Sequence, residues 1–391
     1  MEFGYGDDDD DLEGDFETWK DNVFWPTLKE MYMKDAEVPI LNDDVDQLPE
    51  CAYEVEYLDK TAKPEMQPEQ INNASKYYFS SYDCPVSVVR ELRTKEDSGS
   101  TVHVEIDISK AKGLEYSTAD NLGVLPVNSS DVIESVADSL GYDLDATFAI
   151  RAAPDKEWQG SPFPNPTTVR ECLSRYCDLT GSPRRSDLKQ LAAYAKDPID
   201  KKALLRMASK EGKAEYKEKI VDAVFGLVDI LRMCPSIEAP LEHFLMFCPR
   251  LVPRYYTISS SSSVHPKSVH LTVSVTEATK KDGSILKGVC SSHLADVKPK
   301  ETVRVFNRES TFRLPQDTSR PILMVGPGTG VAPMRALLQE RAFQRKKEKK
   351  QVGKSILYFG CKKRSMDYIY EDEMKSFQKD GTLSQLHLAF S

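Results

Sequence analysis

Hydrophobic and polar residues alternate along two stretches of the chain, at residues 102–108 and within 269–275. A period of two residues is typical of strands that bury one face, as in an antiparallel sheet with one side on the core. We therefore expect both stretches to be half-buried strands of an antiparallel barrel.

The segment between these strands has the longer period of amphipathic helices. The predicted helices cover residues 130–137, 167–176, 186–196, 201–209 and 216–233. The first of them begins with Ser130, a residue type that caps helix N-termini. The pattern thus predicts a barrel that is interrupted by a helical insertion.

A short apolar run at 321–325 ends at Gly326 and is followed by a helical pattern over 334–343. This order predicts a strand, a glycine turn and a helix. Glycines here, with Gly328 and Gly330, let the backbone approach a ligand, and the positive end of the helix favours a pyrophosphate. The loop does not match the G-x-G-x-x-G fingerprint, so a tight structural turn explains it equally well when it is taken alone.

The segment Arg254, Tyr255, Tyr256, Thr257 lies on a predicted strand. It offers a cation for phosphate, aromatic faces for stacking and a hydroxyl group for hydrogen bonding. The alternative is an ordinary strand with packed tyrosines and a solvated arginine. Residues 287–294 supply glycine and small hydroxyl residues before another helix start, where backbone N–H groups can meet phosphate oxygens. Together these motifs point to hydride transfer between NADPH and a flavin.

Composition narrows the class of protein. The chain has 391 residues, of which 40% are hydrophobic, and a formal net charge of −10. This length allows two or three packed domains. The negative charge argues against nucleic acid or an anionic membrane as the main partner and is compatible with a basic protein partner. No apolar run approaches the ~18–20 residues that a membrane span requires.

Cysteine and histidine spacing gives no sign of a metal or disulfide framework. The 8 cysteines form no C-x-x-C pair, and the 6 histidines form no cluster along the sequence. Cys172 and Cys177 lie in a helical stretch and are interpreted as packing residues. We predict no metal site, and a reducing cytosolic environment fits this cysteine usage best.

The ordered motifs resemble the diflavin reductase family, and within it the NADPH–cytochrome P-450 reductases. The matching segments are Arg254–Thr257, 264–270, 287–291, 312–315, 324–333, 338–342, 358–362, 367–370 and 388–391. The resemblance implies an α+β and α/β multidomain fold. Its parts are an antiparallel FAD-binding β-barrel of the ferredoxin reductase type, an inserted helical connecting domain, and an incomplete nucleotide-binding α/β domain.

The resemblance also implies domain boundaries. Residues 1–33 would be the tail of a flavodoxin-like FMN domain, 34–65 a hinge, 66–125 and 246–318 the FAD-binding barrel, 126–245 the helical connecting domain, and 319–391 the incomplete NADP-binding domain.

The cofactor residues follow from the same resemblance. Arg254 should pair with the FAD pyrophosphate, Tyr256 should stack on the isoalloxazine, and Thr257 should act as the catalytic hydroxyl near flavin N5. Thr257 stands where the family usually has serine, and the hydroxyl is kept. The full FAD set is Arg254, Tyr255, Tyr256, Thr257, Thr272, Val273, Ser274, Gly288, Val289, Cys290 and Ser291; the NADP set is Gly328, Thr329, Gly330 and Ser391, with Ser391 at the adenosine 2′-phosphate.

Both ends of the chain match the interior of longer relatives. Residues 3–9 resemble the last FMN-contacting loop, and the residue that would touch FMN is Asp8. Because most of that domain would precede the chain, FMN should not bind here, and a solvated acidic helix start is the simpler interpretation. Family groups needed for catalysis would lie beyond Ser391, so we expect a soluble fragment that is not competent for full turnover.

For the intact protein, the resemblance implies transfer of electrons from NADPH through FAD and FMN to cytochrome P-450 or other haem proteins. It also implies a place on the cytosolic face of the endoplasmic reticulum membrane, held by an anchor that precedes the FMN domain. One alternative is another diflavin reductase, of the methionine synthase, nitric oxide synthase or sulfite reductase type. The other is a non-catalytic flavin-binding or docking module.

Overall fold

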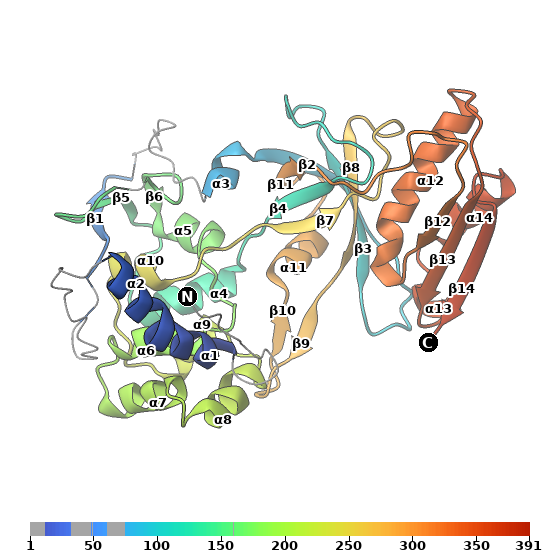
Figure 1. Ribbon diagram of the computed structural model, residues 1–391. Coiled ribbons are helices and arrows are strands. Elements are labelled where there is room, and N and C mark those ends of the chain that lie inside the picture. The colour runs from blue at the N-terminus through green and yellow to red at the C-terminus, as the bar shows by residue number, and fades with distance from the viewer. Residues whose placement is uncertain (1–11, 33–47, 49, 61–74, 159) are drawn as a thin grey trace. The chain divides into compact units, whose positions relative to one another are not determined.

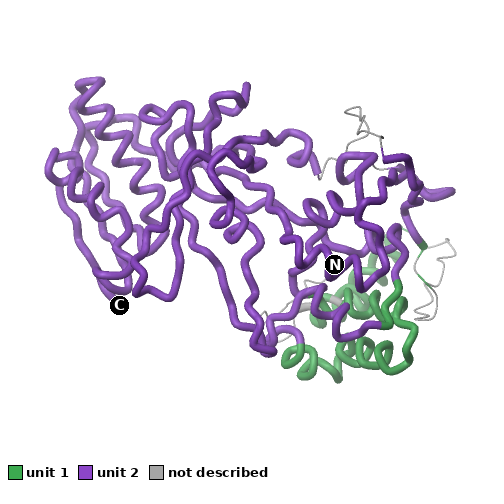
Figure 2. The backbone as a smooth tube through the Cα atoms, turned by 180° about the vertical axis from the view of Figure 1, so that it is seen from behind, with its two compact units in different colours: residues 1–50, 183–219, 236–238 green, residues 51–182, 220–235, 239–391 purple. Residues whose placement is uncertain are grey.

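The computed structural model describes residues 12–32, 48, 50–60, 75–158 and 160–391. The chain forms two compact units, shown in Figure 2: residues 1–50, 183–219 and 236–238 make the first, and residues 51–182, 220–235 and 239–391 make the second. The candidate FAD and NADP residues all belong to the second unit. The predicted domain boundaries at 33 and 65 fall outside the described residues and stay predictions.

The described part of the first unit is helical. Its helices are α1 (Leu12–Trp19), the π-helical η1 (Lys20–Phe24), α2 (Trp25–Tyr32), α6 (Arg185–Ala192), α7 (Pro198–Ala208) and α8 (Lys213–Tyr216). Asp197 starts α7, because its side chain accepts a hydrogen bond from the Ile199 N–H at 2.8 Å, and Pro198 takes the first position. Residues 12–32 are helical throughout. Asp8 and its predicted FMN loop lie outside the described residues.

A six-stranded sheet occupies the centre of the second unit, in the order β7-β4-β11-β2-β3-β8 (Figure 1). Its strands are β2 (Tyr82–Glu91), β3 (Thr101–Asp107), β4 (Asn121–Leu125), β7 (Arg254–Thr257), β8 (Ser268–Ser274) and β11 (Thr302–Arg308). All neighbouring pairs are antiparallel. The alternating patterns at 102–108 and 269–275 therefore belong to paired strands of one sheet, as predicted.

The sheet curls around a single hydrophobic core. Val104, Ile106, Leu122 and Leu271 are fully buried there, and the helix α11 (Val289–Asp296) adds Leu294. Beyond the end of β7, the Ser259 N–H donates to the His270 carbonyl at 2.8 Å. In the described part of the chain, however, the strand ladder does not close between β7 and β8. The antiparallel sheet is confirmed, and the predicted closed barrel is corrected to a curled, open sheet.

The insertion between β4 and β7 contains strands as well as helices. In the second unit its elements are α4 (Ser130–Leu140), β5 (Thr147–Ala152), β6 (Thr167–Thr168), α5 (Val169–Arg175), α9 (Leu227–Met233) and α10 (Leu241–Phe247). β5 lies between β6 and β1 (Tyr53–Leu58) in a three-stranded sheet. The predicted hinge thus contributes a paired strand. The short helix α3 (Lys76–Ser80) precedes β2, and η4 (Lys217–Val221) leads from the first unit into the second.

The prediction of one continuous helix over 216–233 is wrong. Val224 has a φ of 58°, in the left-handed region that side chains with a branched Cβ avoid. Gly226 approaches the chain so closely that a Cβ would lie 2.4 Å from the Thr180 carbonyl oxygen. The helix restarts because the Asp229 carboxylate accepts a hydrogen bond from the Gly226 N–H at 2.9 Å.

The C-terminal segment forms a parallel sheet in the order β12-β13-β14. Its elements are β12 (Ile322–Val325), the 3₁₀ turn η5 (Gly328–Gly330), α12 (Val331–Lys346), β13 (Ser355–Cys361), α13 (Arg364–Asp367), α14 (Glu371–Lys379) and β14 (Gln385–Phe390). Leu338 of α12 and Met374 of α14 share one core with Leu357 and Phe359 of β13. The predicted strand, turn and helix at 321–343 are confirmed.

Of the helices that the structure describes, none combines the length and the hydrophobicity needed to cross a bilayer.

Candidate functional site

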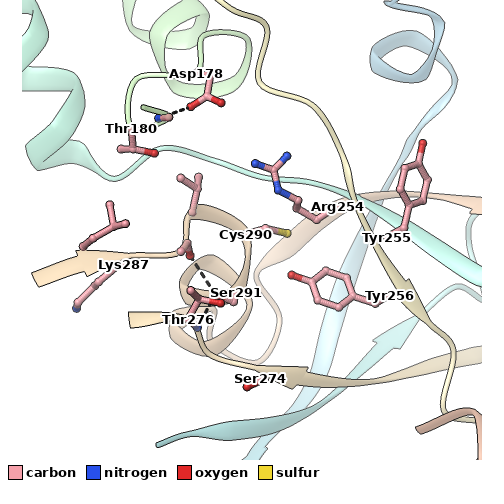
Figure 3. A pocket seen from close by; sticks show the side chains of 14 residues that line it. Asp178, Thr180, Arg254, Tyr255, Tyr256, Ser274, Thr276, Lys287, Cys290 and Ser291 are labelled. Atoms are coloured by element: carbon pink, nitrogen blue, oxygen red, sulfur yellow. Dashed lines mark hydrogen bonds between the residues drawn. The ribbon is translucent and has the colours of Figure 1, made fainter. Parts of the chain in front are cut away.

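A cavity of about 470 Å³ opens beside β7 and β8, at the start of α11 (Figure 3). The predicted FAD residues that line it are Arg254, Tyr255, Tyr256, Ser274, Gly288, Val289, Cys290 and Ser291. Thr257, Thr272 and Val273 do not line it. The structure therefore brings most of the predicted set to one cavity, although the set comes from separate parts of the sequence.

Arg254 and Tyr256 point to the cavity because alternate residues of a strand share a face. β7 is held by pairing with β4, where Arg254 lies opposite Val124. The Arg254 Nη1 donates to the Val252 carbonyl at 2.7 Å. Within the described residues this guanidinium makes no ion pair, so its charge is available to an anion in the cavity.

Tyr256 and Cys290 form a neutral part of the cavity wall. Burial, and next the neighbouring Cys290, raise the pKa of the Tyr256 phenol. Burial raises the pKa of the Cys290 thiol to about 11. Both groups are therefore uncharged near neutral pH, and the aromatic ring of Tyr256 offers an apolar face.

The start of α11 supplies backbone donors to the same cavity. Gly288 precedes the helix, so the N–H groups of Val289, Cys290 and Ser291 have no partner within it. The turn is tight, since a Cβ on Gly288 would lie 2.7 Å from Ser291 Oγ and 2.8 Å from Thr276 Cβ. The Thr276 N–H donates to Ser291 Oγ at 3.1 Å, which leaves this side chain engaged in the turn.

The side chains of Tyr255 and Thr257 project from the other face of β7, although Tyr255 still contributes to the lining of the cavity. The Tyr255 ring meets the Phe306 ring edge-on at 5.9 Å, and the Arg308 guanidinium lies over it at 4.6 Å. The Thr257 hydroxyl donates to Asn121 Oδ1 at 3.0 Å. The hydroxyl predicted to be catalytic is thus bound to the neighbouring strand.

On β8 only Ser274 of the predicted trio lines the cavity. Val273 is buried in the hydrophobic core, and Thr272 Oγ1 lies 2.7 Å from the Tyr370 hydroxyl. Alternation along the strand places Val273 on the opposite face from Thr272 and Ser274, and Thr272 lies farther along the strand, beside Tyr370.

The cavity also has lining residues that the sequence did not indicate. Asp178, Thr180 and Gly181 come from the loop after α5, and Lys287 ends β10 (Ile285–Lys287), which pairs with β9 (Glu277–Thr279). The Asp178 carboxylate accepts a hydrogen bond from the Gly181 N–H at 2.9 Å, which shapes this loop. No pattern near 178–181 links it to a strand some seventy residues away, so only the fold could reveal it.

Asp120 fixes the position of the segment that follows β7. Its carboxylate accepts hydrogen bonds from the N–H groups of Ser117, at 2.8 Å, and Ser310, at 2.9 Å, and it pairs with Arg313. Its carbonyl accepts from the Ile258 N–H at 2.8 Å. Burial alone would raise the pKa of Asp120, but these hydrogen bonds outweigh burial and hold that pKa below its usual value.

The predicted NADP loop forms a turn at the end of β12. The Gly326 N–H donates to the Tyr358 carbonyl at 2.9 Å, Gly328 has a φ of 54°, and Gly328–Gly330 make the 3₁₀ turn that enters α12. The Val331 N–H donates back to the carbonyls of Gly328 and Thr329, and the Gly330 N–H donates to the Pro327 carbonyl at 2.9 Å, so the turn is closed by its own hydrogen bonds. Thr329 lies within the turn.

Ser391 directly follows β14 and donates its N–H to the Cys361 carbonyl at 3.3 Å. Because the three strands are parallel, Gly326 and Ser391 lie at the same, carboxyl edge of the sheet. Ligands of open α/β sheets bind at this edge.

Helix α12 binds the serine segment that follows β7. Arg335 is 5% exposed, and it donates to the Ser259 carbonyl at 2.8 Å and to both oxygens of Glu373, at 2.8 and 3.0 Å. One turn later, Gln339 accepts from the Ser261 N–H at 3.0 Å. The helix that starts at the predicted NADP loop is therefore tied to the strand of the predicted FAD site.

The arrangement fits a dinucleotide flavin. An unpaired guanidinium and the open start of α11 suit a diphosphate, and the neutral ring of Tyr256 suits a stacked aromatic group.

Comparison with known proteins agrees with this assignment. Residues 76–293 match the FAD binding domain family, and residues 324–389 match the oxidoreductase NAD-binding domain. The chain is 38% identical over 408 residues to the NADPH–cytochrome P-450 reductase of Oryctolagus cuniculus, and 40% identical over 401 residues to that of Drosophila melanogaster. It is 37% identical over 408 residues to that of Homo sapiens.

Each of these matches covers 100% of this chain, and the chain spans 58% of the length of the relatives. The resemblance seen in the sequence motifs is confirmed. With its flavin segment and its nicotinamide segment both matched, the chain belongs to the FAD binding domain family of oxidoreductases, as a partial homologue of the NADPH–cytochrome P-450 reductases.

Proposed function

We propose that this chain provides the FAD and NADPH sites of a diflavin reductase. In the intact protein, electrons would pass from NADPH through FAD and FMN to cytochrome P-450 or another haem protein. The bound flavin supplies the redox chemistry, as acceptor of the hydride from NADPH. The observation that carries the proposal is the cavity in which Arg254, Tyr256 and the start of α11 converge.

Within that cavity each group has a distinct task. Arg254 binds the pyrophosphate through charge-assisted hydrogen bonds, and the N–H groups of Val289 and Cys290 take its other oxygens. Tyr256 stacks on the isoalloxazine, which its position beside the cavity and its neutral phenol support. Ser274 lines the same wall and offers a hydroxyl.

We assign Thr257 a role at the reacting end of the flavin. Its hydroxyl now donates to Asn121 Oδ1, so it must rotate about its own Cα–Cβ bond to donate elsewhere. Before that rotation, the hydrogen bond to Asn121 holds the end of β7 in register with β4. Tyr255 supports the strand from the opposite face, against Phe306.

The NADPH site would use the carboxyl edge of the parallel sheet. Gly328, Thr329 and Gly330 form the turn before α12, where the positive end of the helix would favour the pyrophosphate. Ser391, at the end of β14, would bind the adenosine 2′-phosphate and so select NADPH over NADH.

A P-450 acceptor is favoured over the acceptors of other diflavin reductases by the names of the relatives given above. With such an acceptor we further propose an FMN-binding part, including Asp8, and a place on the cytosolic face of the endoplasmic reticulum for the intact protein. The curled, open antiparallel sheet would bind the FAD, with residues 126–245 as the connecting domain.

The first test is the identity of the bound flavin. The chain is purified, its flavin is released by heat, and the released flavin is separated by chromatography. We expect FAD without FMN, and after removal and readdition we expect one FAD per chain. A folded chain that neither carries nor takes up FAD would exclude the proposal for this polypeptide.

A second experiment addresses the acceptor and the docking alternative. The intact protein is reconstituted with a cytochrome P-450, and consumption of NADPH is followed with the P-450 substrate present. Cytochrome c reduction alone does not distinguish the diflavin reductases. Turnover of the P-450 supports the assignment; binding of FAD without reduction by NADPH in the intact protein favours a docking module.

A further inference from the structure

A second cluster of reactive side chains lies outside the flavin cavity, on β3 and β8. The strand register places Glu105 opposite His270 and His103 opposite Thr272. Because His103 and Glu105 are two residues apart, all these side chains share one face of the sheet. The opposite face carries Val104 and the hydrophobic core. Spacing along the sequence gave no hint of this cluster, because its histidines are separated by most of the insertion.

The ligand atoms of this cluster are already close together. His103 Nε2 lies 3.1 Å from Glu105 Oε1, and His270 Nε2 lies 3.8 Å from Glu105 Oε2. One ligand atom from each of the three residues lies within 4.8 Å of the others. Ligands of a tetrahedral zinc ion, about 2.0–2.1 Å from the metal, are separated by roughly 3.3 Å. Small side-chain rotations therefore suffice to enclose an ion.

His270 lacks the partners that a buried imidazole normally has. It is 3% exposed, and its Nδ1 has no hydrogen-bond partner among the described residues. Its Nε2 is beyond hydrogen-bond distance from Glu105. The Nε2 lone pair of His270 is therefore available to an ion when Nδ1 carries the ring proton.

A chain of hydrogen bonds orients the His103 ring through its second nitrogen, Nδ1. His103 Nδ1 lies 2.9 Å from the Tyr370 hydroxyl, which lies 2.7 Å from Thr272 Oγ1. If Nε2 binds a metal, the Nδ1–H donates to Tyr370 and Tyr370 donates to Thr272. Metal-binding histidines are typically oriented by such a second hydrogen bond. Without metal the chain can run in reverse, with the Nε2–H donating to Glu105.

The charges around the cluster are mixed. Two guanidinium groups lie near it: Arg335 of α12, which donates to both carboxylate oxygens of Glu373, and Arg90, which lies 5.8 Å from the centre of the Tyr370 ring. Glu105 contributes a negative charge, and its side chain is 30% exposed, which gives an ion a path from solvent.

We propose that His103, Glu105 and His270 bind a divalent transition-metal ion of the zinc type, with water completing the coordination. Two imidazoles and one carboxylate form a known zinc ligand set. The ion would stiffen the pairing of β3 with β8 and, through Tyr370, their contact with the C-terminal α/β segment. This inference does not depend on the proposed function.

The test is metal binding by the purified chain after treatment with a chelator. Zn²⁺ is titrated calorimetrically, and Co²⁺ is used as a spectroscopic probe, since tetrahedral cobalt absorbs far more strongly than the aqueous ion. We expect one ion per chain, and a rise in the thermal unfolding midpoint when Zn²⁺ is added.

Three variants and one control variant test which residues bind the ion. Glu105→Gln and His270→Gln should weaken Zn²⁺ binding by more than tenfold, and Tyr370→Phe by about 10- to 100-fold. His387→Gln is the control, because His387 is an exposed histidine on β14. If His270→Gln fails to fold, the Zn²⁺ affinity of Glu105→Gln still tests the site, since Glu105 is partly exposed. Absence of saturable binding, or equal binding by wild type, Glu105→Gln and Tyr370→Phe, would overturn the proposal.

Discussion

Replacing Arg254 by glutamine tests the flavin site most directly. The change removes the positive charge and keeps a polar side chain. Arg254 makes one hydrogen bond of 2.7 Å to the Val252 carbonyl, and no ion pair within the described residues. We therefore expect the folded chain to lose little stability from the change.

The loss should appear in FAD affinity. A hydrogen bond to a charged group contributes about 1.5–3 kcal/mol, so Arg254→Gln should raise the FAD dissociation constant about 10- to 150-fold. Arg308→Gln is the matched control, because the Arg308 guanidinium lies over the Tyr255 ring, on the other face of β7. It removes the same charge from the same neighbourhood without touching the cavity.

The assay is titration of the flavin-free proteins with FAD, followed by flavin fluorescence at constant salt. Circular dichroism verifies that each variant is folded. Wild-type affinity in Arg254→Gln, or an equal loss in Arg308→Gln, would show that the diphosphate does not lie beside Arg254, and the assignment of the cavity would then be wrong.

Three further changes test how the site is supported. Asp120→Asn should destabilise the chain by about 2–4 kcal/mol in urea unfolding, because an amide nitrogen then faces buried donors and Arg313 loses its partner. The pKa of Asp120 is depressed, so its contribution to stability is present above about pH 4 and is lost as the pH falls through the folded pKa. The Asp120→Asn variant should therefore lose less stability than wild type over that pH range. Equal losses in the two proteins would contradict this. Gly226→Ala should lower the stability of the chain by about 1–3 kcal/mol, because its Cβ would lie 2.4 Å from the carbonyl oxygen of Thr180. Since Thr180 lines the cavity, the change should also weaken FAD binding. Unchanged thermal unfolding would argue against so tight a contact. In the intact protein, Thr257→Val should slow flavin reduction by NADPH about 5- to 30-fold, whereas Thr257→Ser should not slow it. The rates are measured by stopped-flow absorbance. Equal rates in the two variants would show that the Thr257 hydroxyl has no role at the reacting end of the flavin.

The sequence predicted those parts of the fold and site that depend on local patterns. The alternation at 102–108 and 269–275 indicated strands because one face of each is buried. Arg254 and Tyr256 were recognisable because they lie on one short strand, and Gly288 because it stands at a helix start. In these cases the adjacent residues in the sequence are enough to predict the local structure.

Features that depend on long-range packing could not be predicted. The break at Val224 and Gly226 arises from close approach to Thr180, which apolar periodicity does not encode. Asp178 reaches the flavin cavity only because the insertion folds back to it. The His103 and His270 pair likewise depends on strand register, which spacing in the sequence does not show.

Helix α12 also forms a spacer of fixed length between the two proposed nucleotide sites. Its first residues follow the Gly328 turn, and Arg335 binds the Ser259 carbonyl just beyond β7. Each helical residue advances the chain by about 1.5 Å and turns it by about 100°. Inserting one residue between the turn and Arg335 would therefore displace and rotate the turn relative to β7. Under the proposed function, the distance between hydride donor and acceptor would thus depend on the residue count of a helix that need not touch either of the reacting atoms.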